Sequence, residues 1–173
     1  MKLIHTRLGK GTKIWNYCNI YGLVNKPVFI GDHTQIGSFT EIKPGVTIGK
    51  RCHIQAHVFI SDDTIIEDEV FVGPHALFLN DKYPTSRTAS DKSWQVLPSK
   101  ICKGASIGGG AIIGPGVEIG KYAVVGMGAV VIKSVPAFRV VVGNPAHIIG
   151  DVTSHKYASF FKISDAEKIK KGQ

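Results

Sequence analysis

The chain has 173 residues, of which 43% are hydrophobic and 20% are charged, and its formal net charge is +8. This length and composition suit one globular domain with a sizeable core and exclude an intrinsically disordered chain. The positive charge favours anionic partners such as phosphorylated small molecules. The basic residues are scattered and no recognition motif accompanies them, so we expect no nucleic-acid partner.

The N-terminal stretch lacks a long apolar run, and no apolar segment reaches about 18 residues, the length needed to span a membrane. We therefore expect a cytoplasmic protein without a membrane partner. The three cysteines, Cys18, Cys52 and Cys102, include no CxxC pair. Neither a disulfide framework nor a cysteine zinc site is expected.

From residue 30 onward the sequence repeats with a period of six, in two blocks. Large apolar residues occupy the first position of each unit: Ile30, Ile36, Ile42, Ile48, Ile54, Ile60, Ile66, Val72 and Phe78, then Ile101, Ile107, Ile113, Ile119, Val125 and Val131. Smaller residues follow four positions later: Thr34, Thr40, Val46, Cys52, Val58, Thr64, Val70 and Ala76, then Ala105, Ala111, Val117, Ala123 and Ala129. Glycine often follows the large residue directly, as at Gly31, Gly37 and Gly49.

A period of six fits no α-helix, because an apolar face with the helical period of about 3.6 would drift off these positions. It fits a short strand and a turn, with the large and the small residue facing inward. The glycine is expected to supply a permissive backbone at the corner. One unit cannot bury its apolar face alone, so we predict that the units stack into a solenoid.

Residues 80–100 separate the two blocks and differ in composition. The segment is polar and rich in turn formers, which predicts a loop that leaves the solenoid and returns. Long loops on a rigid scaffold often carry function. The regular pattern ends near Gly150. In the tail, residues 151–173, Ser164 and Glu167 have the spacing of a capping box, which predicts a short helix.

The repeat resembles that of the hexapeptide-repeat acyltransferases over roughly residues 8–150. This resemblance implies an all-β fold, a left-handed parallel β-helix in which three hexapeptides make one coil. Only the resemblance supplies the hand, which departs from the usual right-handed crossover. It also implies a homotrimer that binds acetyl-CoA between subunits, without a metal cofactor. The interval from Phe78 to Ile101 is longer than one such coil, so the frame is interrupted there.

O-acetyltransferases of this family carry an Asp-x-x-His-Pro element near such a loop. The matching residues here are Asn80-Asp81-Lys82-Tyr83-Pro84, with Tyr83 where the histidine would stand. An alcohol acceptor needs a general base, whereas a neutral amine is already a nucleophile. The presence of Tyr83 in place of the histidine therefore favours N-acylation over O-acylation.

Several stretches, "KIWNYCNI", "VGPH", "FLNDKYPTSR", "PSKICKGASIG" and "VVGNPAHIIG", resemble bacterial N-acetyltransferases of nucleotide-linked 3-amino sugars. The resemblance implies acetyl transfer from acetyl-CoA to the 3-amino group of a nucleotide-linked 3-amino-3,6-dideoxyhexose, with dTDP as the expected nucleotide. A UDP-linked 3-amino uronic acid is the alternative substrate. Such products serve surface polysaccharides, including the O-antigen of lipopolysaccharide.

The resemblance and the residue chemistry together select candidate catalytic residues. Asn80 can accept a hydrogen bond from the sugar amine and aim its lone pair at the thioester. Asp81 can do the same or take a proton. His57 and His75 share one phase, three hexapeptides apart, and should lie about 4.8 Å apart on adjacent coils, pointing outward. His75 is the candidate base, although both histidines could instead pack at a trimer interface.

The remaining candidates concern binding. Gln55 and His57 are expected to contact the substrate, while Lys82, Tyr83 and Arg87 could hold the nucleotide diphosphate and base. The expected coenzyme A residues are Gly108, Gly126, Lys133, Arg139, Asn144 and Pro145, although the fold could need the two glycines at its corners anyway.

Three other functions stay open. The protein could be an O-acetyltransferase that uses His75 as the base. It could be a metal protein like the γ-class carbonic anhydrases, with His53, His57 and His75 as ligands. It could also be a scaffold without catalytic activity.

Overall fold

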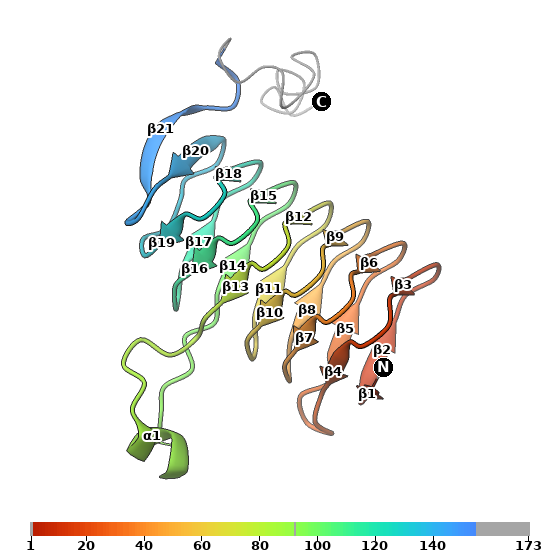
Figure 1. Cartoon of the computed structure of the whole chain (residues 1–173). Helices are drawn as coiled ribbons and strands as arrows, with labels where there is room; N and C mark the ends of the chain where they lie inside the picture. The colour runs from red at the N-terminus through yellow and green to blue at the C-terminus, as the bar shows by residue number, and fades with distance from the viewer. Residues whose placement is uncertain (1, 92, 155–173) are drawn as a thin grey trace.

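A computed structural model describes residues 2–91 and 93–154 of the chain, which form three sheets arranged as the sides of a prism (Figure 1). Sheet A consists of β1 (Lys2–Ile4), β4 (Asn19–Tyr21), β7 (Glu41–Ile42), β10 (Phe59–Ile60), β13 (Leu77–Phe78), β16 (Ile112–Ile113) and β19 (Val130–Val131). Sheet B consists of β2 (Thr6–Leu8), β5 (Val28–Ile30), β8 (Thr47–Ile48), β11 (Ile65–Ile66), β14 (Lys100–Ile101) and β17 (Glu118–Ile119). Sheet C consists of β3 (Lys13–Ile14), β6 (Gln35–Ile36), β9 (His53–Ile54), β12 (Phe71–Val72), β15 (Ser106–Ile107), β18 (Val124–Val125), β20 (Arg139–Val142) and β21 (His147–Asp151).

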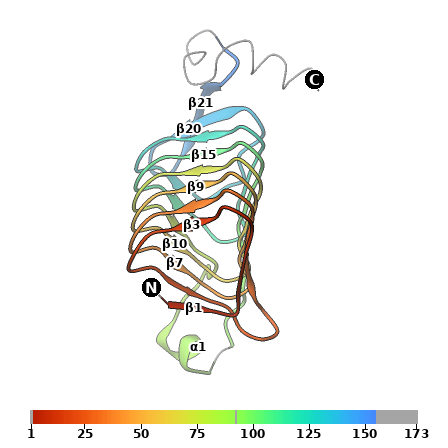
Figure 2. The same ribbon diagram turned by 90° about the vertical axis from the view of Figure 1, so that its right-hand side faces the viewer.

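The chain visits the sheets in turn, so each coil contributes one strand to every side and the coils stack along one axis (Figure 2). The described strands pair in parallel, except for β20 with β21. Partners in uninterrupted coils are three hexapeptides apart in sequence, as are Ile36 and Ile54. The predicted left-handed parallel β-helix is confirmed.

The core follows the period of six. All the predicted first positions are at most 2% exposed, and all the predicted small positions are at most 3% exposed. Inward hydroxyl groups have partners: Oγ1 of Thr34 donates to the Gly49 carbonyl at 2.8 Å and accepts from the Cys52 amide at 3.0 Å. Burial therefore costs these polar side chains little.

The expected role of the glycine after each large residue is wrong. These glycines do not have positive φ. They are small because adjacent coils touch there: a Cβ at Gly37 would lie 2.5 Å from the Ala56 nitrogen. The left-handed backbone occurs two positions later, and non-glycine residues such as Arg51 (φ 55°) and Asp63 (φ 58°) often occupy it.

The predicted loop is confirmed and runs between β13 and β14, projecting from the prism (Figure 1). The loop is inserted into the single connection from sheet A to sheet B and adds no coil to the prism. Ile101, after the loop, still pairs with Ile66 on the preceding coil of sheet B. The Leu97 amide donates to the Asn80 carbonyl at 2.8 Å, and the Gly116 amide donates to the Leu97 carbonyl at 2.9 Å, which closes the base of the loop.

The loop contains a short helix, α1 (Ser86–Asp91), which sequence reasoning did not predict. Its start is capped reciprocally. The Thr88 amide donates to Oγ1 of Thr85 at 3.1 Å, and the Thr85 amide donates to Oγ1 of Thr88 at 3.2 Å. At the C-terminal end of the prism, β20 and β21 form an antiparallel closing hairpin, and residue 150 lies inside β21. The tail helix predicted at Ser164–Glu167 lies outside the described residues.

Candidate active site

Four rings form a column along the corner where the chain passes from sheet C to sheet A. Neighbouring rings in the order Tyr17, Phe39, His57 and His75 stack with centroids 5.0, 4.8 and 4.8 Å apart. Each residue has φ near +60°, which turns its side chain outward from the corner. The predicted spacing of His57 and His75 is confirmed, and both histidines are exposed.

The column continues with Gly110, whose amide donates to the Pro74 carbonyl, and with Gly128 on the next coil. A Cβ built on Gly128 would meet no atom within 4 Å. His75 is therefore the last ring of the column, at the edge of an open stretch of the same corner.

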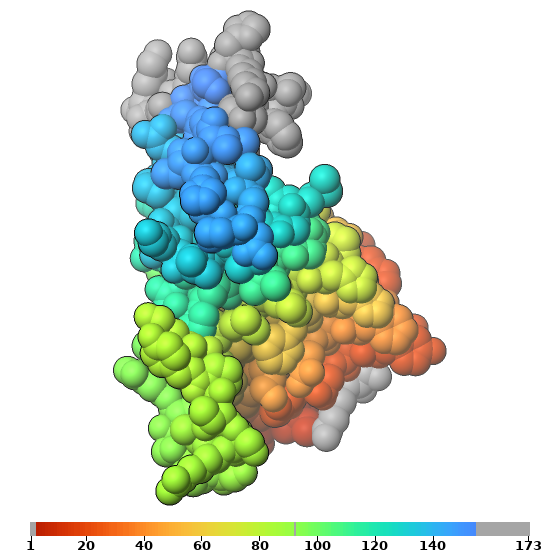
Figure 3. Space-filling view, turned by 60° about the vertical axis from the view of Figure 1, so that its left-hand side comes forward, coloured from red at the N-terminus to blue at the C-terminus, as the bar shows by residue number. Residues whose placement is uncertain are grey.

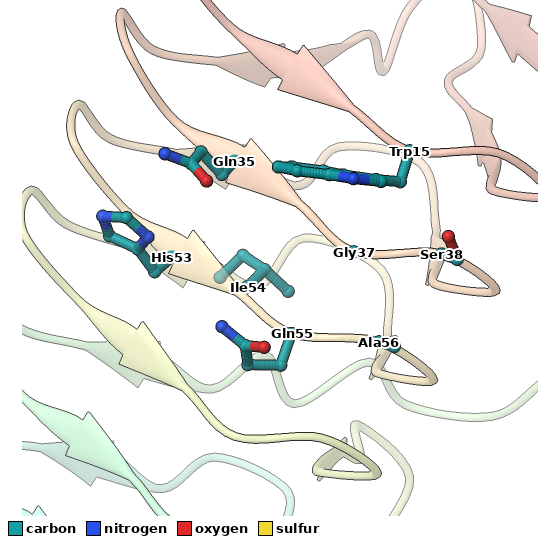
Figure 4. A pocket seen from close by; sticks show the side chains of 8 residues that line it. All are labelled: Trp15, Gln35, Gly37, Ser38, His53, Ile54, Gln55 and Ala56. Carbon is teal, nitrogen blue, oxygen red and sulfur yellow. The ribbon is translucent and has the colours of Figure 1, made fainter.

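Beside this column, a hollow of about 370 Å³ opens on the N-terminal coils of sheet C. It is lined by Trp15, Gln35, Gly37, Ser38, His53, Ile54, Gln55 and Ala56 (Figure 4). Its polar groups are amides, an imidazole and a hydroxyl, and its largest flat surface is the indole of Trp15. Gln55, a predicted substrate contact, lies in this hollow, whereas Trp15 and Gln35 were missed.

A second hollow, of about 480 Å³, opens on the C-terminal coils of the same sheet. Its lining is mostly apolar and comprises Phe71, Ser106, Ile107, Gly108, Val124, Val125, Gly126, Met127, Val140, Val142 and Ile149. The predicted coenzyme A residues Gly108 and Gly126 both line it. The coil packing also demands glycine at 108, because a Cβ there would lie 2.5 Å from the Met127 nitrogen.

Asn80 lies just after β13, at the corner between sheets A and B where the loop leaves the prism. Its side chain is 8% exposed, and Nδ2 donates to Oδ2 of Asp62 at 3.4 Å. Among the described residues no donor contacts its side-chain oxygen. Since a run of extended chain of roughly 15 Å separates His75 from Asn80, one chain does not bring the two side chains together.

The other loop candidates gather near a hollow inside the loop, which Asp81, Lys82, Tyr83 and Trp94 help to line. Oδ1 of Asp81 accepts from the Tyr83 amide at 2.9 Å, a local turn contact. Nζ of Lys82 lies 5.4 Å from the centroid of the Tyr83 ring. Arg87 lies on α1 and is exposed. In Figure 3 the loop forms the lime-green lobe at the lower left of the molecule.

The remaining predicted coenzyme A residues are divided between two places. Lys133 follows β19, at the corner that also carries Asn80 and the loop. Asn144 and Pro145, joined by a cis peptide bond, form the turn between β20 and β21. Nη1 of Arg139 lies 3.6 Å from Oδ2 of Asp151, so this guanidinium serves the closing hairpin.

A sequence signal for the missed Trp15 does exist. Trp15 and Gln55 directly follow Ile14 and Ile54, in the position where glycine stands at Gly37 and elsewhere in the repeat. Large polar or aromatic residues in a slot that usually holds glycine mark a place where the surface departs from regular coil packing.

The described residues also bear on metal binding and on membrane spans. In the described part of the chain, no three His, Cys, Asp or Glu side chains are gathered closely enough to hold a metal ion. His53 lines the first hollow while His57 and His75 stack in the ring column. No helix within residues 2–91 and 93–154 is long and apolar enough to cross a membrane.

Comparison with known proteins agrees with this geometry. Residues 27–62 and 98–133 match the family model described as bacterial transferase hexapeptide (six repeats). A hexapeptide-repeat acetyltransferase of Vibrio cholerae, solved with acetyl-CoA, is 28% identical, with 70% of this chain and 69% of that chain covered and a TM-score of 0.65. No curated protein matches the chain in sequence.

Two structures of AntD, an N-acyltransferase from Bacillus cereus, share the fold. A mutant solved with dTDP-4-amino-4,6-dideoxyglucose and coenzyme A is 23% identical, with 90% and 89% of the two chains covered and a TM-score of 0.72. A second mutant, solved with dTDP and coenzyme A, is 22% identical, with 95% and 90% covered and a TM-score of 0.74. The period of six, the β-helix and the family match together identify the chain as a member of the hexapeptide-repeat family of bacterial transferases, with acyl or acetyl transfer as its supported activity.

Proposed function

We propose that the protein transfers an acetyl group from acetyl-CoA to the amine of a nucleotide-linked amino sugar, a 3-amino-3,6-dideoxyhexose carried by dTDP. One observation carries the proposal. Two hollows of different chemistry lie on one face, sheet C, and they adjoin at the neighbouring corner, where His57 belongs to the last coil of the first hollow and His75 to the first coil of the second. A transfer between two large cosubstrates requires two binding sites whose reactive ends meet.

The chemistry assigns each hollow. The apolar hollow at Gly108 and Gly126 suits the pantetheine arm and acyl chain, because small residues let a thin chain approach the backbone. The polar hollow at Gln55 suits the nucleotide sugar. The AntD structures, which share the fold and contain a dTDP sugar or dTDP together with coenzyme A, support this pair of ligands as a proposal for the present chain.

The reaction needs little from the protein beyond placement. The lone pair of the neutral amine forms the C–N bond at the thioester carbon, and the C–S bond breaks. A backbone N–H at the glycine-rich corner holds the oxygen while it is negative. The ammonium proton passes to His75 or Asp81, or through water to the departing thiolate.

We assign the positioning of the amine to Asn80. The contact from its Nδ2 to Asp62 orients the amide, so that its side-chain oxygen is held ready for a donor. Because His75 and Asn80 of one chain lie at different corners, we propose that the site forms between two copies of a homotrimer. The loop of one copy then brings Lys82, Tyr83 and Arg87 toward the phosphates on its neighbour. Lys133, Asn144 and Pro145 would face the adenosine phosphates.

Thiol release from acetyl-CoA, measured with dTDP- and UDP-linked 3-amino and 4-amino sugars, tests the proposal. We expect turnover with a 3-amino sugar and none with the corresponding hydroxyl sugar. Asn80→Ala should lower kcat/KM at least tenfold, whereas Asn25→Ala, in an exposed turn, should not change it. Acetylation of the hydroxyl sugar instead would identify an O-acetyltransferase with His75 as the base. No thiol release with any sugar of the panel, together with no thermal stabilisation of the protein by acetyl-CoA, would refute the proposal.

A further inference from the structure

The hollow beside Trp15 can be compared with the ring column at the neighbouring corner. In the neighbouring ring column, residues at equivalent positions of successive coils stack their rings 4.8–5.0 Å apart. Trp15 begins a similar series on sheet C, but the equivalent residue on the next coil is Gly37 and the one after it is Gln55. Coil packing requires glycine at position 37, so no side chain from that coil lies between the Trp15 indole and the Gln55 amide.

The hollow of about 370 Å³ gives room for a flat guest, because it opens over Gly37 and is lined by both Trp15 and Gln55. Figure 4 shows the indole edge-on, reaching over the coil of Gly37, with the Gln55 amide on the far side. The indole remains 47% exposed, so its face is accessible.

Polar groups lie where the edge of such a ring would be. Gln35 and His53 are register partners on adjacent strands of sheet C and line the hollow next to Gly37. A glutamine amide offers both a donor and an acceptor, which complements the alternating carbonyl and N–H groups of uracil or thymine. Lys13, the register partner of Gln35 on the preceding coil, is exposed and adds a positive charge for a phosphate.

We propose that this hollow is a nucleobase site, in which the uracil or thymine ring of a nucleoside diphosphate stacks on Trp15 above Gly37 while Gln35 and Gln55 bind its edge. The proposal rests on the proposed function and deepens it, since it names where the nucleotide of the sugar substrate is held. It makes Trp15, rather than Tyr83 of the loop, the stacking surface for the base.

The test uses dTDP and UDP, without any sugar, titrated calorimetrically into the full-length protein. Trp15→Ala should weaken dTDP binding about tenfold or more, because stacking on an aromatic side chain contributes strongly to binding of a base. Trp15→Phe should be intermediate. Trp94→Phe, which changes the other tryptophan of the chain, should bind as the wild type does. Thermal stabilisation by acetyl-CoA should be the same in all variants, which also shows that they fold.

In the Trp94→Phe variant the only tryptophan is Trp15, so saturable quenching of its fluorescence by dTDP, with the same Kd as by calorimetry, is expected. The inference is overturned if Trp15→Ala binds dTDP as tightly as the wild type. It is also overturned if Tyr83→Ala loses dTDP binding while Trp15→Ala keeps it. Loss of acetyl-CoA stabilisation in Trp15→Ala, with dTDP binding intact, would assign the hollow to the adenosine of coenzyme A and overturn it too.

These outcomes separate the inference from the proposed function. Binding of dTDP that depends on Trp15, in a protein that acetylates no amino sugar, would sustain the nucleobase site and refute the proposed function. Acetylation of amino sugars without dTDP binding would sustain acetyl transfer and refute the nucleobase site.

Discussion

Gly108→Ala tests why the repeat contains so many glycines, because the structure assigns Gly108 to coil packing and not to backbone conformation. A Cβ at this position would lie 2.5 Å from the Met127 nitrogen and 2.7 Å from the Gly126 carbonyl carbon. An ordinary contact is about 3.5 Å, so the two coils must separate by nearly 1 Å. Both obstacles are backbone atoms, which cannot rotate away as a flexible side chain would.

The cost follows from what that separation damages. The Gly108 amide donates to the Val125 carbonyl at 2.8 Å, and the Ser106 amide donates to the Ala123 carbonyl at 2.9 Å, so both bonds join the two coils. Overpacking costs about 1–3 kcal/mol, and each weakened backbone hydrogen bond costs up to about 1 kcal/mol. We expect a loss of about 2–4 kcal/mol in the free energy of unfolding. In a chain of this size that lowers Tm by roughly 5–15 °C.

Gly128→Ala is the matched control. Gly128 has φ +65°, and a Cβ there would meet nothing within 4 Å. The left-handed backbone costs alanine about 1–2 kcal/mol, and the reduced freedom of the unfolded chain offsets about half of this. Urea unfolding and differential scanning fluorimetry should rank Gly108→Ala well below Gly128→Ala. Equal or reversed stabilities would refute the packing explanation and restore backbone conformation as the reason for the glycines.

Three further predictions use other parts of the molecule. Replacing residues 82–96 by a short turn should abolish acetyl transfer but change Tm by only a few degrees in a thermal scan, because α1 buries none of its residues; a large fall in Tm would show that the loop stabilises the coils. Burial, and then the nearby Glu118, raise the pKa of Cys102 to about 11, so at pH 8 about one thiol in a thousand is ionised, and reaction with a disulfide reagent should be at least about a hundredfold slower in the native protein than in urea. Comparable rates in both conditions would contradict this burial. The hydrogen bond from Arg51 lowers the pKa of Glu69 below 4.5, so the stabilisation is complete above that pH and is lost as the pH falls through the lower folded value. Glu69→Gln should therefore cost under about 1 kcal/mol at pH 7 in urea unfolding, since the pair is partly exposed, and this difference from the wild type should shrink as the pH falls below 4.5; a difference that does not shrink on acidification would refute the assignment to the carboxylate.

Local pattern was enough for the solenoid and its core, whereas the hand of the β-helix came only from the family resemblance. The period of six reports inward and outward directions residue by residue, so the burial of positions such as Ile60 and Ala111 could be predicted without coordinates. The stacking of His57 on His75 followed from the same period, because three hexapeptides return the chain to the same corner. Such predictions succeed in a solenoid because each coil contacts chiefly its neighbours.

Contacts between coils were decided by the tertiary structure. The glycines appeared to be corner residues in the sequence, and only the approach of Gly37 to the Ala56 nitrogen showed their packing role. The loop length did not reveal that the insertion falls within a single step, which the pairing of Ile66 with Ile101 established.

The tertiary structure likewise decided which residues make up the candidate site. Asn80 and His75 are close in sequence but lie at different corners. Trp15 and Gln55, by contrast, are distant in sequence yet line one hollow, because two coils bring them to the same face. The sequence by itself therefore determined which side chains point inward or outward, a property of the local backbone. The tertiary structure decided which outward side chains meet, because that depends on how the coils and the inserted loop are placed against one another.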